Sequence, residues 1–167
     1  MKKFCLTNVI IVFLLICFDG IYAQTIQSKL NQVELMKQFL GTWERELSQD
    51  TIRTIEFRSF GNGIEYSSKT TVKENIIREG RSFMGYDNKN NKLIQCLIFS
   101  TSPDVLLYSW WFTSPTEFTL ILYEDISYPE NAAFISKGEL KSPDLLVETH
   151  IKNNTTIGTF TWHRVKK

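Results

Sequence analysis

After residue 42 the chain consists of short runs rich in β-branched and aromatic residues, separated by turn-forming residues. The runs recur at spacings of about 8–12 residues, which is typical of a β-sandwich or β-barrel and not of alternating strands and helices. Gly61-Asn62-Gly63 is the clearest hairpin signal, because these residues accept the positive φ of tight turns. We therefore expect about ten strands, over residues 43–47, 52–57, 64–72, 76–86, 93–99, 105–112, 118–124, 133–140, 145–151 and 157–165.

A helix is expected before the first strand, over residues 26–40. Its apolar residues Ile26, Leu30, Val33 and Leu40 fall at helix-like intervals, and a glycine follows the last of them. Polar residues occupy the opposite side, so the apolar side needs a surface to bury it. We expect this helix to cover one open end of the β-structure.

The last two strands can be aligned on the expected two-residue turn at Asn153-Asn154. With that turn, alternate residues of the two strands share a face. One face is polar, includes Glu148, His150 and His163, and is expected to point outward. The other face is apolar and is expected to line the interior, with Val147 opposite Phe160 and Leu145 opposite Trp162.

The run 106–112 is apolar on both of its faces. Tyr108, Trp110 and Phe112 point one way, Leu107 and Trp111 point the other, and one of these faces can line the interior. An exposed apolar face is unfavourable in water, so the other face needs a cover. The helix or a loop is the favoured cover, and a homodimer through the Trp110-Trp111 strand is the alternative.

Residues 1–23 have the layout of a secretory signal peptide, with the basic start Met1-Lys2-Lys3, an apolar run over 9–18 and Ala23 before Gln24. The apolar run is shorter than the ~20 residues that cross a bilayer. We therefore expect a secreted or periplasmic protein whose mature chain, 24–167, has no transmembrane segment. Lipid anchoring through Cys17 is an alternative.

Removal of residues 1–23 leaves equal numbers of basic and acidic residues and Cys96 as the single cysteine. No block of like charge remains to attract nucleic acid. One cysteine forms no internal disulfide, so the mature chain must be stabilised by its core. Its length is sufficient for one domain with one core.

Gly41-Thr42-Trp43 at the first strand, with Arg164 near the end of the last, resembles the calycin superfamily of lipocalins, fatty-acid-binding proteins and nitrobindin-like barrels. A helix, this motif and roughly ten strands together are most similar to exported bacterial lipocalin-like domains of unknown function. The resemblance implies an all-β fold: an antiparallel up-and-down β-barrel of about ten strands with the short N-terminal helix capping one end. It also implies structural roles for Gly41, which opens the barrel, and for Trp43, which closes one end beneath Arg164.

Fatty-acid-binding proteins end with an arginine-x-tyrosine pair that holds a carboxylate, and this chain has Phe160-Thr161-Trp162 at that place. The departure favours a small apolar ligand, bound non-covalently in the lumen. Arg78 and Arg81 could supply a charge to the ligand from elsewhere, but an arginine on a strand of this kind more often faces solvent, which is the favoured expectation. The lumen wall is expected to include Leu145, Val147, Phe160 and Trp162. The main alternative is a filled barrel that serves as a structural or interaction module.

No residue pattern indicates catalysis, a cofactor or a metal site. Cys96 alternates with Ile94 and Ile98 and is expected to be a small buried hydrophobe. His163 would suit a nitrobindin-like haem barrel if it faced inward, but the expected register turns it outward. His150 lies too far from it along the paired strands to share a metal ion. We expect a binding protein and not an enzyme.

Overall fold

The structure is a computed structural model that describes residues 30–166 of the 167-residue chain. The expected signal segment 1–23, with Cys17, lies outside the described residues, as does the beginning of the expected helix 26–40. Within residues 30–166, no helix has the length and apolar character needed to cross a bilayer.

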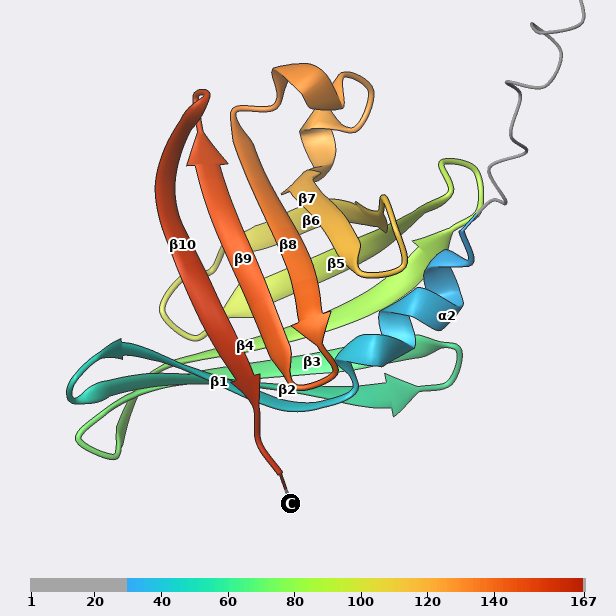
Figure 1. The fold of residues 1–167 in the computed structure, drawn as a ribbon. Coiled ribbons are helices and arrows are strands. Elements are labelled where there is room, and N and C mark those ends of the chain that lie inside the picture. The colour runs from blue at the N-terminus through green and yellow to red at the C-terminus, as the bar shows by residue number, and fades with distance from the viewer. Residues whose placement is uncertain (1–29, 167) are drawn as a thin grey trace, which may run out of the picture.

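The strands of the described chain close into one antiparallel barrel, which confirms the expected fold class (Figure 1). Each strand pairs with its neighbours in sequence, and the first strand pairs with the last. The strands are β1 (Gly41–Ser48), β2 (Thr51–Phe60), β3 (Gly63–Val72), β4 (Asn75–Asp87), β5 (Lys92–Phe99), β6 (Val105–Phe112), β7 (Glu117–Leu122), β8 (Phe134–Ser142), β9 (Leu145–Lys152) and β10 (Thr155–Arg164).

Residues with positive φ form the tight turns between several strands. Gly61 (φ 59°) lies in the β2–β3 turn, and Asn153 (φ 48°) and Asn154 (φ 61°) form the β9–β10 turn. Both turns were expected from composition. Lys73 (φ 47°) and Glu74 (φ 68°) adopt the same left-handed conformation in the β3–β4 turn without a compositional signal.

The register of the last hairpin differs from the prediction beyond its turn. It shifts by one residue between Thr156 and Gly158, where β10 carries a β-bulge. The bulge places Leu146 opposite Trp162 and brings Glu148 onto the same side as that indole. An extra residue reverses which side chains share a face. The predicted pairs Val147–Phe160 and Leu145–Trp162 are therefore wrong, and the observed partners are Val147–Thr161, Leu145–His163 and Glu148–Phe160.

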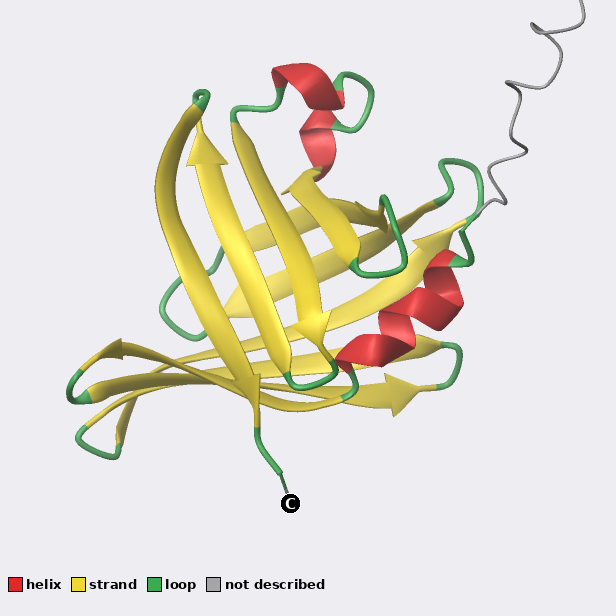
Figure 2. Ribbon diagram, viewed as in Figure 1, coloured by secondary structure: helices red, strands yellow, loops and turns green. Residues whose placement is uncertain are grey.

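The helical segment before β1 consists of α2 (Gln32–Met36) and η1, a single 3₁₀ turn (Lys37–Phe39), and it covers one end of the barrel (Figure 2). The Asn31 side chain caps α2 by accepting a hydrogen bond from the Glu34 backbone N–H at 3.2 Å. The Met36 and Phe39 side chains are only 1% and 2% exposed, because they belong to the barrel core.

One face of β6 lines the barrel interior, and the other is covered in part by the loop that follows β7. Ser109, and Ile121 of the neighbouring β7, are fully buried on the outer face, where η2 (Tyr123–Asp125) contacts β6. A further 3₁₀ turn, η3 (Pro129–Asn131), follows in the same connection. Trp111 is half-buried beneath Lys92, whose Nζ lies 4.0 Å from the ring centroid. Leu107 remains 43% exposed.

Candidate ligand-binding cavity

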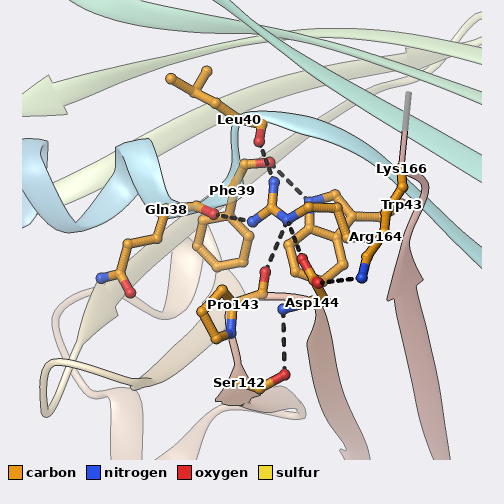
Figure 3. Close-up of polar contacts among 9 residues, drawn as sticks. All are labelled: Gln38, Phe39, Leu40, Trp43, Ser142, Pro143, Asp144, Arg164 and Lys166. Atoms are coloured by element: carbon orange, nitrogen blue, oxygen red, sulfur yellow. Dashed lines mark hydrogen bonds and ion pairs between the residues drawn. The ribbon is translucent and has the colours of Figure 1, made fainter.

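Trp43 and Arg164 close the barrel beneath the helical segment (Figure 3). The two residues are direct partners across the β1–β10 seam, and the Arg164 guanidinium carbon lies 4.2 Å from the indole centroid. The indole Nε1 donates a hydrogen bond to the Phe39 carbonyl at 2.8 Å. Gly41 has φ 118°, and a Cβ there would come within 2.9 Å of Arg164. The expected contact between indole and guanidinium is confirmed, and Gly41 is required by its positive φ.

Arg164 also ties the helical segment to the β8–β9 turn (Figure 3). Its two terminal nitrogens donate to the carbonyls of Gln38, at 2.7 Å, and Leu40, while its Nε donates to the Pro143 carbonyl at 2.8 Å. The Asp144 carboxylate lies 3.5 Å from the same Nε. Since the guanidinium is a planar fork of donors, one side chain fixes three separate backbone groups.

A cavity of about 340 Å³ lies inside the barrel above this closed end. This volume is at the lower end of the range of about 300–1,000 Å³ for small-molecule pockets. Arg78 lines the cavity and has an exposed side chain. The lining nearest the helical segment is apolar and largely aromatic, and consists of Phe39, Trp43, Ile55, Phe57, Met84, Leu97, Trp110, Phe118, Leu146 and Trp162.

Charged residues line the part of the cavity further from the helical segment. Arg45 and Arg53 lie directly opposite each other on β1 and β2, and Arg78 enters from β4. The Arg45 guanidinium carbon lies 4.1 Å from the Phe160 ring centroid and 4.5 Å from that of Trp162. Burial lowers the Arg45 pKa below its ordinary value, and the neighbouring charge of Arg53 adds to this effect.

Arg45 and Arg53 leave donors without protein acceptors. The Arg45 side chain is only 8% exposed, and its Nε and one terminal nitrogen are buried without a hydrogen-bond partner among the described residues. The Nε of Arg53 is in the same situation, and one terminal nitrogen makes a long contact of 3.5 Å with the Tyr66 hydroxyl. Such buried unpaired donors are uncommon in folded proteins.

Glu148 is the acidic side chain of the cavity lining, and it is fully engaged by neighbours. Its oxygens accept hydrogen bonds from Ser136 Oγ at 2.7 Å and Trp162 Nε1 at 3.2 Å, and His150 Nε2 lies 3.2 Å away. Burial alone would raise the Glu148 pKa, but the interactions with His150, Ser136 and Trp162 outweigh it and lower the pKa to about 2. Glu148 is therefore ionised at neutral pH.

A second hollow, of about 530 Å³, lies where β1 and β10 separate. The two strands pair only at Trp43–Arg164 and Glu44–His163. Arg45 lines both this hollow and the inner cavity. The Arg45 guanidinium therefore lies between the lumen and a cleft at the barrel seam.

The structure places two of the four predicted wall residues at or beside the cavity. Trp162 lines it, and Phe160 lies on the same strand face beneath Arg45. Leu145 and Val147 do not line it, because the bulge turns Leu146 and Glu148 inward in their place. Whether any of these residues binds a ligand stays a prediction.

The other residues singled out in the sequence lie as follows. Cys96 is exposed, so its expected burial is wrong: Gln95 and Leu97 on either side of it point into the barrel. Arg81 faces solvent as expected and pairs with Glu65 at 3.3 Å. Arg78 is exposed but also stacks on Phe99 at 3.6 Å and lines the cavity.

The histidines are separated by the wall of the barrel. His163 is exposed on the outside, as expected, and His150 lies inside against Glu148, contrary to the expected outward position. The inward histidine near the C-terminus that a haem barrel would need is therefore not His163. No group of three histidine, cysteine or acidic side chains in residues 30–166 is placed to hold a metal ion.

No protein-family model and no curated protein sequence matches this chain. The closed antiparallel barrel is compatible with a calycin-like fold. The likeness is therefore one of architecture alone.

Sequence reasoning missed the charged part of the cavity. The alternation of residues along β1 and β2 could have revealed Arg45 and Arg53, because each occupies an inward position on a strand whose other inward residues are mostly apolar. Glu148 and His150 were assigned to the wrong face because the bulge at Ile157 was not recognised. Its one signal in the sequence is the glycine that follows, Gly158.

Proposed function

We propose that this protein is an exported lipocalin-like binding protein that holds a small, mainly apolar molecule non-covalently in its barrel. The observation that carries the proposal is the cavity of about 340 Å³, whose inner part is lined by aromatic and aliphatic side chains. Apolar walls supply affinity through the area that a ligand removes from water, and a few polar groups orient it. Export is supported by the signal-peptide layout of residues 1–23.

A fluorescent apolar dye tests the proposal directly. Three of the four tryptophans, Trp43, Trp110 and Trp162, line the cavity. N-phenyl-1-naphthylamine bound there should quench their emission and fluoresce itself. We expect saturable binding with one dye per chain. Absence of saturable binding in correctly folded protein would contradict the proposal.

Adjacent residues of β6 provide a matched pair of variants. Leu106 lines the cavity, whereas Leu107 lies on the outer face and is 43% exposed. Leu106→Trp should fill part of the lumen and weaken dye binding at least about tenfold, by loss of buried apolar contact. Leu107→Trp adds the same indole outside and should leave dye affinity unchanged. Equal effects of the two variants would place the dye outside the lumen.

An interaction module is the second candidate, and an exposed apolar surface favours it. Phe83, Cys96 and Leu107 are cross-strand neighbours on the outer face of β4, β5 and β6, and Ile98 and Val105 form the adjoining pair. The apolar side chains among them are 43–55% exposed. In this case the chain should form dimers whose dissociation constant rises on Leu107→Glu, as measured by analytical ultracentrifugation. The homodimer through this strand would use Leu107 and Trp111, since Trp110 points into the barrel.

A further inference from the structure

We propose that the ligand carries an anionic end group, a carboxylate or a comparable oxyanion, which binds between Arg45 and Arg53. This inference rests on the proposed function and specifies the chemistry of the molecule in the lumen. The apolar part of the ligand lies against the aromatic lining near Trp43, and the anionic end lies further from the helical segment.

Two like charges lie directly opposite each other in the lining of the cavity. Arg45 on β1 and Arg53 on β2 are cross-strand partners, and both line the cavity. Like charges in this position repel and destabilise a sheet. Neither forms an ion pair with a carboxylate of the described residues. An oxyanion between the two guanidiniums turns this repulsion into two attractive contacts.

Arg45 has buried hydrogen-bond donors without a partner among the described residues. More than nine-tenths of this side chain is buried, and two of its three nitrogens have no hydrogen-bond partner among residues 30–166. Phe160 and Trp162 lie against the guanidinium face. Such contacts stabilise the cation but leave its in-plane N–H groups free. Those N–H groups form a planar fork that matches a carboxylate in a bidentate contact.

The carboxylate of the cavity lining, Glu148, does not neutralise these arginines. Glu148 is held by Ser136, Trp162 and His150, which occupy its oxygens. Even with Glu148 ionised, the three arginines Arg45, Arg53 and Arg78 leave the cavity lining with excess positive charge. An anionic group is therefore favoured here, and a cationic one is disfavoured.

The position of the arginines gives the ligand a direction. Arg45 follows Trp43 by one inward-facing position on β1, so the charged part of the cavity lies directly above the aromatic closed end. Arg78, which belongs to the charged part of the lining, is exposed. A ligand with one apolar and one anionic end therefore fits with the apolar end innermost.

Two dyes that differ by a single group provide the test. N-phenyl-1-naphthylamine and 8-anilino-1-naphthalenesulfonate share their rings, and only the second carries an anion. Titration of the wild-type protein should give at least about tenfold tighter binding of the sulfonate, as expected for charge-assisted hydrogen bonds. Decanoate should displace the bound dye at least about tenfold better than decanol for the same reason. These wild-type measurements need no variant.

Variants locate the anion. Arg45→Gln should remove the preference for the sulfonate while leaving affinity for the neutral dye, and Arg45→Lys should keep part of it because it retains the charge without the fork. Arg53→Gln is a second, independent variant should Arg45→Gln fail to fold. Arg81→Gln removes an arginine from the outer surface and should behave as the wild type.

The outcomes separate this inference from the proposed function. Equal affinity for both dyes would overturn the anionic ligand and leave an apolar-ligand protein. A preference for the sulfonate that survives both Arg45→Gln and Arg53→Gln would also overturn it, since the anion would then bind elsewhere. Saturable binding of neither dye would overturn the inference and the proposed function together.

Discussion

At the scale of single residues, the arginines of this barrel have different roles because their surroundings differ. Arg164 donates to three backbone carbonyls and covers an indole, so its donors are used within the fold. Arg45 is buried against two aromatic rings with donors unused. Arg81 pairs with a surface carboxylate, where screening by water makes the contact weak. The same residue type therefore stabilises the fold as Arg164, lines the candidate site as Arg45 and faces solvent as Arg81.

Arg164→Lys should destabilise the protein strongly although it preserves the charge. An ammonium cannot span the carbonyls of Gln38, Leu40 and Pro143 or cover the Trp43 ring as a plane does. We expect a loss of about 2–4 kcal/mol in the free energy of unfolding, measured by urea denaturation with tryptophan fluorescence. Arg81→Lys is the matched control and should leave the midpoint unchanged. Equal midpoints for the two variants would refute this role of Arg164.

Glu148 should make stability depend on acid pH. Its folded pKa of about 2 lies below its ordinary value of 4.5, so the unfolded chain takes up the proton first as pH falls. Stability contributed by the ionised carboxylate is therefore complete above about pH 4.5 and is lost towards pH 2. The loss should be on the order of 3 kcal/mol.

The measurement compares urea denaturation of the wild type and Glu148→Gln between pH 7 and pH 2. The variant should be less stable at neutral pH, and its difference from the wild type should shrink as pH falls through this window. Glu65→Gln, on the outer face, is the control and should follow the wild-type pH profile. A difference between wild type and Glu148→Gln that stays constant with pH would contradict the assignment.

At the scale of elements, the strands could be predicted, but the register of the last hairpin could not. Period-two alternation and turn residues located all of the strands, and the Gly-x-Trp motif located the closed end. The β10 bulge was not predicted, because the pairing of the two strands was counted from their turn and continued along the strands without a shift. One extra residue at Ile157 was enough to move Glu148 and His150 from the expected outer face to the lumen. As a result, the sequence did not predict that Glu148 and His150 belong to the polar part of the candidate site.

The helical segment depends on one buried glutamine. Gln32 is 4% exposed; its Nε2 donates to the Phe112 carbonyl at 3.2 Å and its Oε1 accepts from the Phe112 N–H at 2.7 Å. Gln32→Leu leaves both backbone groups without this partner, so we expect a loss of about 2–4 kcal/mol. Faster hydrogen exchange at the Phe112 amide should accompany it.

Gln38→Leu is the control for this prediction. Gln38 is only half-buried and donates to the Pro115 carbonyl at 3.0 Å, a group that water can satisfy in its absence. It should change stability much less than Gln32→Leu. An unchanged exchange rate at Phe112 in Gln32→Leu would show that α2 is held to β6 by apolar packing alone.

At the scale of the whole molecule, closure of the sheet joins the candidate site to stability. The β1–β10 seam has only two paired positions. Two arginines bridge it by covering an indole on the opposite strand: Arg164 of β10 covers Trp43 of β1, and Arg45 of β1 covers Trp162 of β10. One of these bridges belongs to the closed end and the other to the candidate anion site. A ligand at Arg45 therefore contacts the seam on which closure depends.

Ligand binding should accordingly stabilise the entire barrel. A ligand that binds only the folded state adds about 2.7 kcal/mol to the free energy of unfolding at a concentration of 100 times its dissociation constant. With N-phenyl-1-naphthylamine, the urea midpoint should rise while the slope of the transition stays the same, because the same surface is exposed on unfolding. At the same dye concentration Leu106→Trp should reduce the rise to about half or less, since the added indole occupies part of the cavity that Leu106 lines. Leu107→Trp should retain it. A rise of equal size in both variants would place the dye on the outer surface and leave the lumen without a ligand.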